Sequence, residues 1–312
     1  RFYHIFENLS IFLTKKSIST YQRLISFIVN NKLYDKVQLL RQEIQRIFFK
    51  NNKWRIFMKS LKNKKVALIF LALGTILTSC KNQNPKIDLG NKISIELIQI
   101  PDQNFCITKT EITQDFYQAV TGENPSTIKG KKFPVESVSW YDSIVFCNKL
   151  SIQQSKTPCY KVNGSTNPSD WNYTPHTHKS IEGTIEFDPA ADGYRIPTME
   201  EWDIAIKGGE NFSYSGSEDV DTVAWTDCNS GETLHEVAQL KPNSYGVYDM
   251  SGNVFEWVWF IREDSSRYYR GGSYFDSIRD AKCTAKKLNY ASGQFKTVGF
   301  RITCNKQITE KK

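Results

Sequence analysis

The sequence has few of the patterns on which common catalytic sites are built. It contains only four histidines and shows no CxxC pair, no glycine-rich phosphate loop and no Ser/His/Asp arrangement. It also shows no internal repeat and no low-complexity tract, which excludes a repeat protein and a disordered chain. What it does contain, 39% hydrophobic residues in a chain of 312, is enough for one large domain or two small ones.

The net charge of +8 is unevenly distributed. Residues 1–79 hold 15 Lys+Arg and 3 Asp+Glu; subtraction from the totals of 41 and 33 leaves 26 and 30 for the remainder. The basic excess therefore belongs to the first quarter of the chain, and the rest is mildly acidic. A nucleic-acid partner, which requires a basic surface, is not expected.

An export signal is predicted between Met58 and Cys80. Four lysines after Met58 precede the apolar run Val66–Leu77, which is the order of a secretory signal. The following Leu77-Thr78-Ser79-Cys80 resembles the bacterial lipobox, a resemblance that implies a lipid on the thiol of Cys80 and removal of the preceding peptide. The apolar segment 66–79 is shorter than the about 20 residues of a membrane span, although a short transmembrane anchor is the alternative.

This signal divides the chain and places its main domain outside the cytoplasm, lipid-anchored to the outer membrane or cell surface. The predicted segments are 1–57, an upstream extension absent from the mature protein; 58–80, the signal peptide; 81–92, a tether; 93–304, a single domain; and 305–312, a polar tail. Six further cysteines follow Cys80, an even number that could pair in an oxidising compartment. Free thiols in the core are the alternative.

Local patterns predict a strand and three helices. Apolar and polar residues alternate over 93–100, as in a strand with one buried face. A short helix is expected after Thr113. Two more should follow Ser139 and Thr198, each a hydroxyl residue three positions before a carboxylate, which is the pattern of a capping box. The polar segment 157–192 between them is predicted to be an ordered insertion with one or two short strands.

Several segments together resemble the formylglycine-generating (sulfatase-modifying factor) family. They are Lys109–Thr113, Pro134-Val135, Val138–Asp142, Gly193–Thr198, Glu201-Trp202, Gly208-Gly209, Tyr245–Trp257, Arg270–Tyr274 and Gly299–Arg301. They cover about residues 93–304 in the family's order. The resemblance implies an α+β fold, the family's irregular and loop-rich variant of the C-type lectin fold, in a single domain.

The resemblance also implies a structural Ca²⁺ ion and one disulfide. The matching calcium ligands are the side chains of Asp249 and Glu256 and the carbonyls of Gly252 and Val254, oxygen donors of the kind that Ca²⁺ prefers. The alternative is that Asp249 caps a turn and Glu256 is a solvated strand residue. The family pattern pairs Cys147 with the C-terminal strand, so a Cys147–Cys304 disulfide is expected.

The oxidase chemistry of the family is not expected, because its copper-binding cysteine pair is replaced by Asp276 and Ala281. Cu(I) requires thiolate ligands, so copper is not predicted. Ser273 and Cys283 are the remaining catalytic candidates, and an oxidase with a rearranged site around Cys283 is the alternative function. Another family branch holds iron with histidines, for which His176, His178 and His235 are the candidates; a surface pair at 176 and 178 is the simpler reading.

A binding function is therefore predicted, on a calcium-braced scaffold that presents the segment 275–298 to an extracellular glycan, peptide or protein. Aromatic, Arg and adaptable polar residues are typical of recognition surfaces. The candidate ligand-binding residues are Phe275, Asp276, Arg279, Asn289, Tyr290, Phe295 and Lys296. The alternative is a solvated loop over the former active-site groove.

Overall fold

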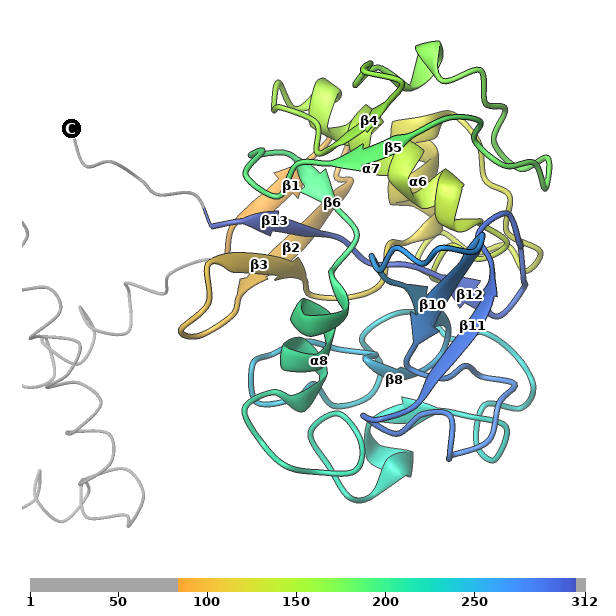
Figure 1. Cartoon of the computed structure of the whole chain (residues 1–312). Coiled ribbons are helices and arrows are strands. Elements are labelled where there is room, and N and C mark those ends of the chain that lie inside the picture. Colours follow the sequence, from red (N-terminus) through yellow and green to blue (C-terminus); the bar gives the residue numbers. More distant parts are fainter. Residues whose placement is uncertain (1–83, 307–312) are drawn as a thin grey trace, which may run out of the picture. The chain divides into compact units, whose positions relative to one another are not determined.

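The computed structural model describes residues 84–306 of the chain. Its larger sheet has five antiparallel strands in the order β1-β2-β3-β13-β6 (Figure 1). These strands are β1 (Lys86–Asp88), β2 (Ser94–Gln99), β3 (Phe105–Thr108), β6 (Tyr194–Arg195) and β13 (Thr303–Asn305). The last strand of the chain thus lies between β3 and β6, inside the sheet, so the two ends of the domain are joined through backbone hydrogen bonds.

Helices cover both faces of this sheet because its strands alternate. Leu97 and Cys106 belong to the core formed with α6 (Gln114–Thr121) and α7 (Trp140–Gln153). Ile98 and Ile107, the next residues on the same strands, belong to the core formed with α8 (Met199–Lys207). Successive side chains of a strand point to opposite faces, so both faces of the sheet are buried.

The predicted helix starts are confirmed. Ser139 accepts from the backbone N–H of Asp142 and begins α7, while Thr198 accepts from that of Glu201 and begins α8. In each capping box the carboxylate also accepts from the cap residue's N–H. α8 ends at Gly208, whose φ of 60° is a left-handed conformation that suits glycine.

A second sheet has the order β11-β10-β9-β12. Its strands are β9 (Phe255–Trp257), β10 (Ser266–Arg270), β11 (Lys286–Tyr290) and β12 (Val298–Gly299), and only β9 and β12 run parallel. Two smaller sheets pair β4 (Tyr160–Val162) with β5 (Ile185–Phe187) and β7 (Ala224–Trp225) with β8 (Ser251–Gly252), and two 3-10 turns cover Pro168–Asp170 and Val220–Thr222. Within residues 84–306, no helix has the length and apolar character needed to cross a membrane.

Two boundaries can be compared with the sequence predictions. The predicted insertion 157–192 does carry two short strands, β4 and β5. The predicted tether 81–92, in contrast, contains β1, whose Ile87 is buried and pairs with Ile95 of β2. β1 has only three residues, of which Ile87 is the one apolar residue, so it gives no periodic signal and was not predicted. Cys80 and the proposed signal lie outside the described residues.

The structure places Cys106, and not Cys147, opposite Cys304 in the sheet. All six cysteines of the described region are free thiols. Cys304 on β13 lies directly opposite Cys106 on β3. Cys147 instead lies near Cys159, since the residues that follow them, Asn148 and Tyr160, are joined by two hydrogen bonds between side chain and backbone. The family pattern could not indicate Cys106 as the neighbour because the contact depends on strand register.

Candidate functional site

The residues at the expected oxidase site follow a tight turn at the end of β10. Gly271 and Gly272 have φ values of 100° and 81°, and a Cβ on Gly272 would lie 2.8 Å from the backbone of Ala281. Glycine is therefore required for the loop 273–281 to fold back against its own start. Ser273, the next residue, is fully buried.

Asp276 occupies the first expected copper position and is held by two partners. One carboxylate oxygen accepts from the hydroxyl of Ser273, and the other accepts from Nζ of Lys287 at 2.6 Å. Lys287 also lies 3.3 Å from Asp280. Burial lowers the pKa of Lys287, but the hydrogen bond and charge of Asp276 outweigh it and raise the pKa above its ordinary value. We call these four residues, Ser273, Asp276, Asp280 and Lys287, the Asp276 cluster.

The second copper position holds no ligand. Ala281 is fully buried and contributes only a methyl group. The nearby thiol, Cys283, is also buried, and burial raises its pKa to about 11. At neutral pH this group is a protonated thiol, which is a poor nucleophile and a poor metal ligand. The loop therefore lacks the thiolate pair that Cu(I) needs.

The predicted ligand-binding residues divide between two faces of the second sheet. On one face, Lys287 lies over the ring of Phe255 at 4.9 Å, next to the Asp276 cluster. Phe275 is exposed there, and Nζ of Lys296 lies 4.9 Å from its ring centroid. The side chain of Asn289, two residues from Lys287 on the same strand, also points to this face.

Tyr290 points to the opposite face of β11, with an exposed fraction of 68%. Leu288, exposed at 41%, lies on that same face opposite Tyr268, against which Phe260 packs with ring centroids 5.5 Å apart. Ile261 is exposed beside Phe260 in the sequence. We call Phe260, Leu288 and Tyr290, together with the neighbouring exposed Ile261, the outer face of β10–β11.

The other two predicted ligand-binding residues differ from each other. Arg279 is exposed in the loop after β10. Phe295 is a scaffold residue, because its ring is partly buried against the first core and its carbonyl accepts from the N–H of Ser137 at 3.0 Å. An aromatic residue in a polar loop suggested recognition, but packing accounts for it.

The predicted calcium motif forms a buried ion pair. Both carboxylate oxygens of Glu256 accept from the guanidinium of Arg301 at 2.7 Å, and one also accepts from the indole of Trp202 at 2.7 Å. Glu256 is fully buried, so it is not a solvated strand residue. Asp249 accepts from the N–H of Ala238 at 2.7 Å. Glu256 is thus already paired with Arg301 in this arrangement, and the calcium site stays a prediction.

The backbone of the same motif has a structural role. A Cβ on Gly252 would lie 2.3 Å from the carbonyl oxygen of Trp225, so only glycine allows β7 and β8 to approach. Val254 N–H and the Asn253 amide both donate to the buried carboxyl of Glu111. Burial raises the pKa of Glu111 well above its ordinary value. The turn is thus fixed by Glu111, which lies in the first family segment.

Comparison with known proteins agrees with this geometry. The sulfatase-modifying factor enzyme 1-like domain matches residues 57–306. The chain belongs to this family. Its Gly-Gly turn, buried Glu256 and C-terminal Arg301 are the family segments identified in the sequence, and in this family member the two copper positions hold Asp276 and Ala281.

Three relatives show the range of the family. A protein named chaperone protein LppX from Paenibacillus barcinonensis is 35% identical over 77% of this chain and 99% of its own length. The solved structure of Treponema denticola variable protein 1 is 31% identical, with a TM-score of 0.64 over 71% of this chain and 98% of that one. The inactive Cα-formylglycine-generating enzyme 2 of Bos taurus is 20% identical over 69% of this chain and 90% of its own length.

The histidines considered for iron are engaged in separate places. His176 Nδ1 lies 3.5 Å from a carboxylate oxygen of Asp142, and Nε2 lies 3.9 Å from one of Glu123. His178 is exposed, and His235 stacks on the indole of Trp225 with ring centroids 3.7 Å apart. In the described part of the chain, no group of three His, Cys, Asp or Glu side chains is arranged to hold a metal.

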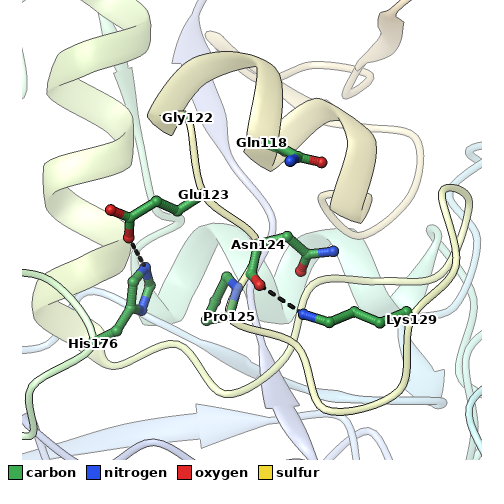
Figure 2. A pocket seen from close by; sticks show the side chains of 7 residues that line it. All are labelled: Gln118, Gly122, Glu123, Asn124, Pro125, Lys129 and His176. Carbon is green, nitrogen blue, oxygen red and sulfur yellow. Dashed lines mark hydrogen bonds and ion pairs between the residues drawn. The ribbon is translucent and has the colours of Figure 1, made fainter.

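A surface cavity of about 660 Å³ lies beside His176. Figure 2 shows the Glu123 carboxylate directed to the imidazole of His176 and Lys129 directed to the carbonyl of Asn124. The charged groups that line this cavity, Glu123 and Lys129, are thus already bound to other lining residues. This cavity was not predicted, because its lining comes from three separate segments: α6, the following loop and the insertion 157–192.

Two residues that hold the candidate site together, Lys287 and Glu111, were not singled out from the sequence. Lys287 had no motif, although its position opposite Tyr269 on β10 brings it to Asp276. Glu111 was visible only as part of a family segment. Lys287 could have been identified as a charged residue on the inward face of a strand, but which face is inward can be told only when the register of β10 and β11 is known.

Proposed function

We propose that this protein is a binding protein without oxidase activity, and that its ligand is an exported polypeptide. The observation that carries the first part is the Asp276 cluster. Where the oxidase needs two thiolates, this chain has a buried methyl group and a carboxylate that is already held by Ser273 and Lys287. An inactive relative in the same family supports the view that the scaffold is used without the oxidase chemistry.

The ligand class is supported by a relative and by the surface. The LppX relative is named a chaperone, and a chaperone binds polypeptides. The outer face of β10–β11 exposes Phe260, Ile261, Leu288 and Tyr290 on one side of an edge strand. Exposed apolar and aromatic groups beside a cationic one, here Lys286 with its Nζ 5.2 Å from the ring centroid of Tyr268, are typical of protein-binding surfaces.

The location proposed for this function is the cell envelope. The predicted lipobox at Cys80 would anchor the protein in a membrane, with the domain exposed outside the cytoplasm. We expect radiolabelled palmitate to be incorporated by the wild-type chain and not by Cys80→Ser; equal labelling of both would exclude lipid attachment at Cys80.

The absence of oxidase activity is tested with Cu(I) and a cysteine-containing peptide. We expect the wild-type protein to show neither stoichiometric Cu(I) binding nor oxygen uptake. The double variant Asp276→Cys/Ala281→Cys restores the thiol pair and should gain Cu(I) binding, because thiolates are the ligands that Cu(I) requires. Oxygen uptake by the wild-type protein with conversion of the peptide would refute the proposal.

The polypeptide ligand is tested separately, by suppression of the aggregation of reduced lysozyme. We expect the wild-type protein to suppress it and Leu288→Ser/Tyr290→Ser to lose most of the effect. Ile152→Ser is the matched control, because Ile152 is exposed at 48% but lies on α7, away from the second sheet. Equal losses in both variants would show that the outer face of β10–β11 has no special role.

A further inference from the structure

Cys106 and Cys304 occupy a position in the sheet that suits a covalent bond. They lie opposite each other on β3 and β13, which run antiparallel. Two hydrogen bonds flank them: Thr108 N–H to the Ile302 carbonyl at 2.9 Å, and Lys306 N–H to the Asn104 carbonyl at 2.8 Å. Hydrogen-bonded pairs recur at every second residue of such a ladder, with Cα atoms about 5.5 Å apart.

The pair 106–304 falls midway between these two bonds, so it is itself a hydrogen-bonded pair. Its expected Cα separation of about 5.5 Å lies within the range for disulfides, but the Cβ atoms of such a pair lie up to about 5.5 Å apart and a disulfide needs about 3.5–4.5 Å, so the two strands must move slightly closer for the bond to form. Directly opposite residues of an antiparallel pair point to the same face. Both side chains indeed belong to the first core and are buried.

The two thiols also interact with each other. A hydrogen bond from Cys304 lowers the pKa of Cys106, although burial acts in the other direction, and the positive charge of Lys306 adds to the effect. The Cys106 Sγ lies 3.3 Å from the amide oxygen of Gln99. The Cys106 thiol is the donor in this contact, which favours its protonated form and opposes the effect of Cys304.

We propose that Cys106 and Cys304 form a cross-strand disulfide in the exported protein. The bond forms by two exchange steps with a disulfide oxidant such as oxidised glutathione. The Cys106 thiolate attacks the oxidant and releases one thiol; Cys304, after losing its proton, attacks the mixed disulfide and releases the second. The protein loses two electrons and two protons, and the oxidant is reduced to two thiols.

The bond would connect the two ends of the domain. β3 is near the start of the described chain and β13 is its last strand, so the closed loop contains roughly 200 residues, and long loops gain most from a cross-link. β13 has only three residues. A covalent bond at its central residue would hold this short strand in place between β3 and β6.

Peptide mapping of the full chain tests the connectivity directly. The protein is refolded from denaturant in oxidised and reduced glutathione, so that the buried thiols are accessible to the oxidant, then alkylated in denaturant and digested with trypsin without reduction. We expect the peptide 93–109 to be linked to the peptide 302–306. A link between 133–149 and 302–306 would instead place Cys147 on Cys304, and alkylated Cys106 and Cys304 would show free thiols. Either result would overturn the proposal.

Thermal unfolding gives an independent test. Reduction should lower the Tm of the wild-type protein by about 5–15 °C. Because alanine also changes core packing, each variant is compared only with itself in the oxidised and reduced states. Cys304→Ala should lose most of the difference, whereas Cys228→Ser, which removes an exposed thiol, should keep it. An unchanged difference in Cys304→Ala would show that another bond causes it.

Discussion

Replacement of Arg301 by methionine should destabilise the protein more than most single substitutions. The guanidinium is fully buried and donates to both oxygens of Glu256, to the carbonyl of Thr108 at 3.1 Å and to that of Tyr248 at 2.8 Å. Methionine fills similar space but leaves Glu256 as a buried charge. Breaking a buried pair from one side costs about 3–5 kcal/mol. For a domain of this size that corresponds to a Tm lower by about 6–20 °C.

The assay is thermal unfolding of wild type, Arg301→Met, Glu256→Gln and the double variant. We expect the double variant to be more stable than Arg301→Met, because it removes the carboxylate that lost its partner. The free energies of the two single variants should therefore not add. A fall in Tm below about 3 °C for Arg301→Met, or additive effects, would show that the ion pair contributes little to the fold.

The same variants decide between the ion pair and the calcium site predicted from the sequence. The structure leads us to expect the same Tm for the wild-type protein in Ca²⁺ and in a chelator. A rise in Tm with Ca²⁺ that Glu256→Gln loses would contradict this expectation. It would mean that a cation displaces the guanidinium from Glu256, and that the ion pair belongs only to the calcium-free protein.

Three further predictions concern single groups. Asp142→Asn should lower the folding stability by about 1–2 kcal/mol at pH 7, because it weakens the capping box of α7. Although burial raises the pKa of Asp142, hydrogen bonds from His176 keep it below its ordinary value. The contribution of the carboxylate is therefore present above about pH 4 and lost below it, so the unfolding curves of the wild-type protein and the variant should converge in acid. Because burial raises the pKa of Cys283 to about 11, iodoacetamide at pH 7.5 should label the exposed Cys228 well before it, and labelling at equal rates would contradict this. Lys287→Met should leave the outer face of β10–β11 functional in aggregation suppression, since Lys287 points to the other side of β11; a loss equal to that of Leu288→Ser/Tyr290→Ser would refute the separation of the two faces.

The sequence predicted those parts of the fold whose signals are local. Ser139 and Asp142 are three residues apart, so the start of α7 could be read from a short segment. The alternating residues of β2 were also sufficient. Strands of two or three residues, such as β6 and β12, have no periodicity to detect. For these, the ordered family segments supplied only the fold class, and the individual strands were not predicted.

The contacts that define the candidate site depend on register and could not be predicted in the same way. Glu256 and Arg301 are 45 residues apart, and their pairing follows from the parallel contact of β9 and β12. The calcium prediction treated Glu256 as a free ligand because the sequence could not show that Arg301 reaches it. The Cys147–Cys304 prediction had the same weakness, since the neighbour of Cys304 is set by the pairing of β3 with β13.

Asp276, at a position that the family resemblance assigns to an oxidase cysteine, has a structural role in its loop. A carboxylate at position 276 in a partly buried loop needs a positive partner, because an unpaired charge there would be costly. Lys287 supplies it from β11, and the hydroxyl of Ser273 satisfies the second oxygen. These contacts attach the loop 273–281 to β11 of the second sheet. Restoring two cysteines would remove this tie and leave Lys287 unpaired with Asp276, so a gain of Cu(I) binding in Asp276→Cys/Ala281→Cys should be accompanied by a lower Tm. Copper binding without any loss of stability would show that the Asp276 cluster is not what holds the loop.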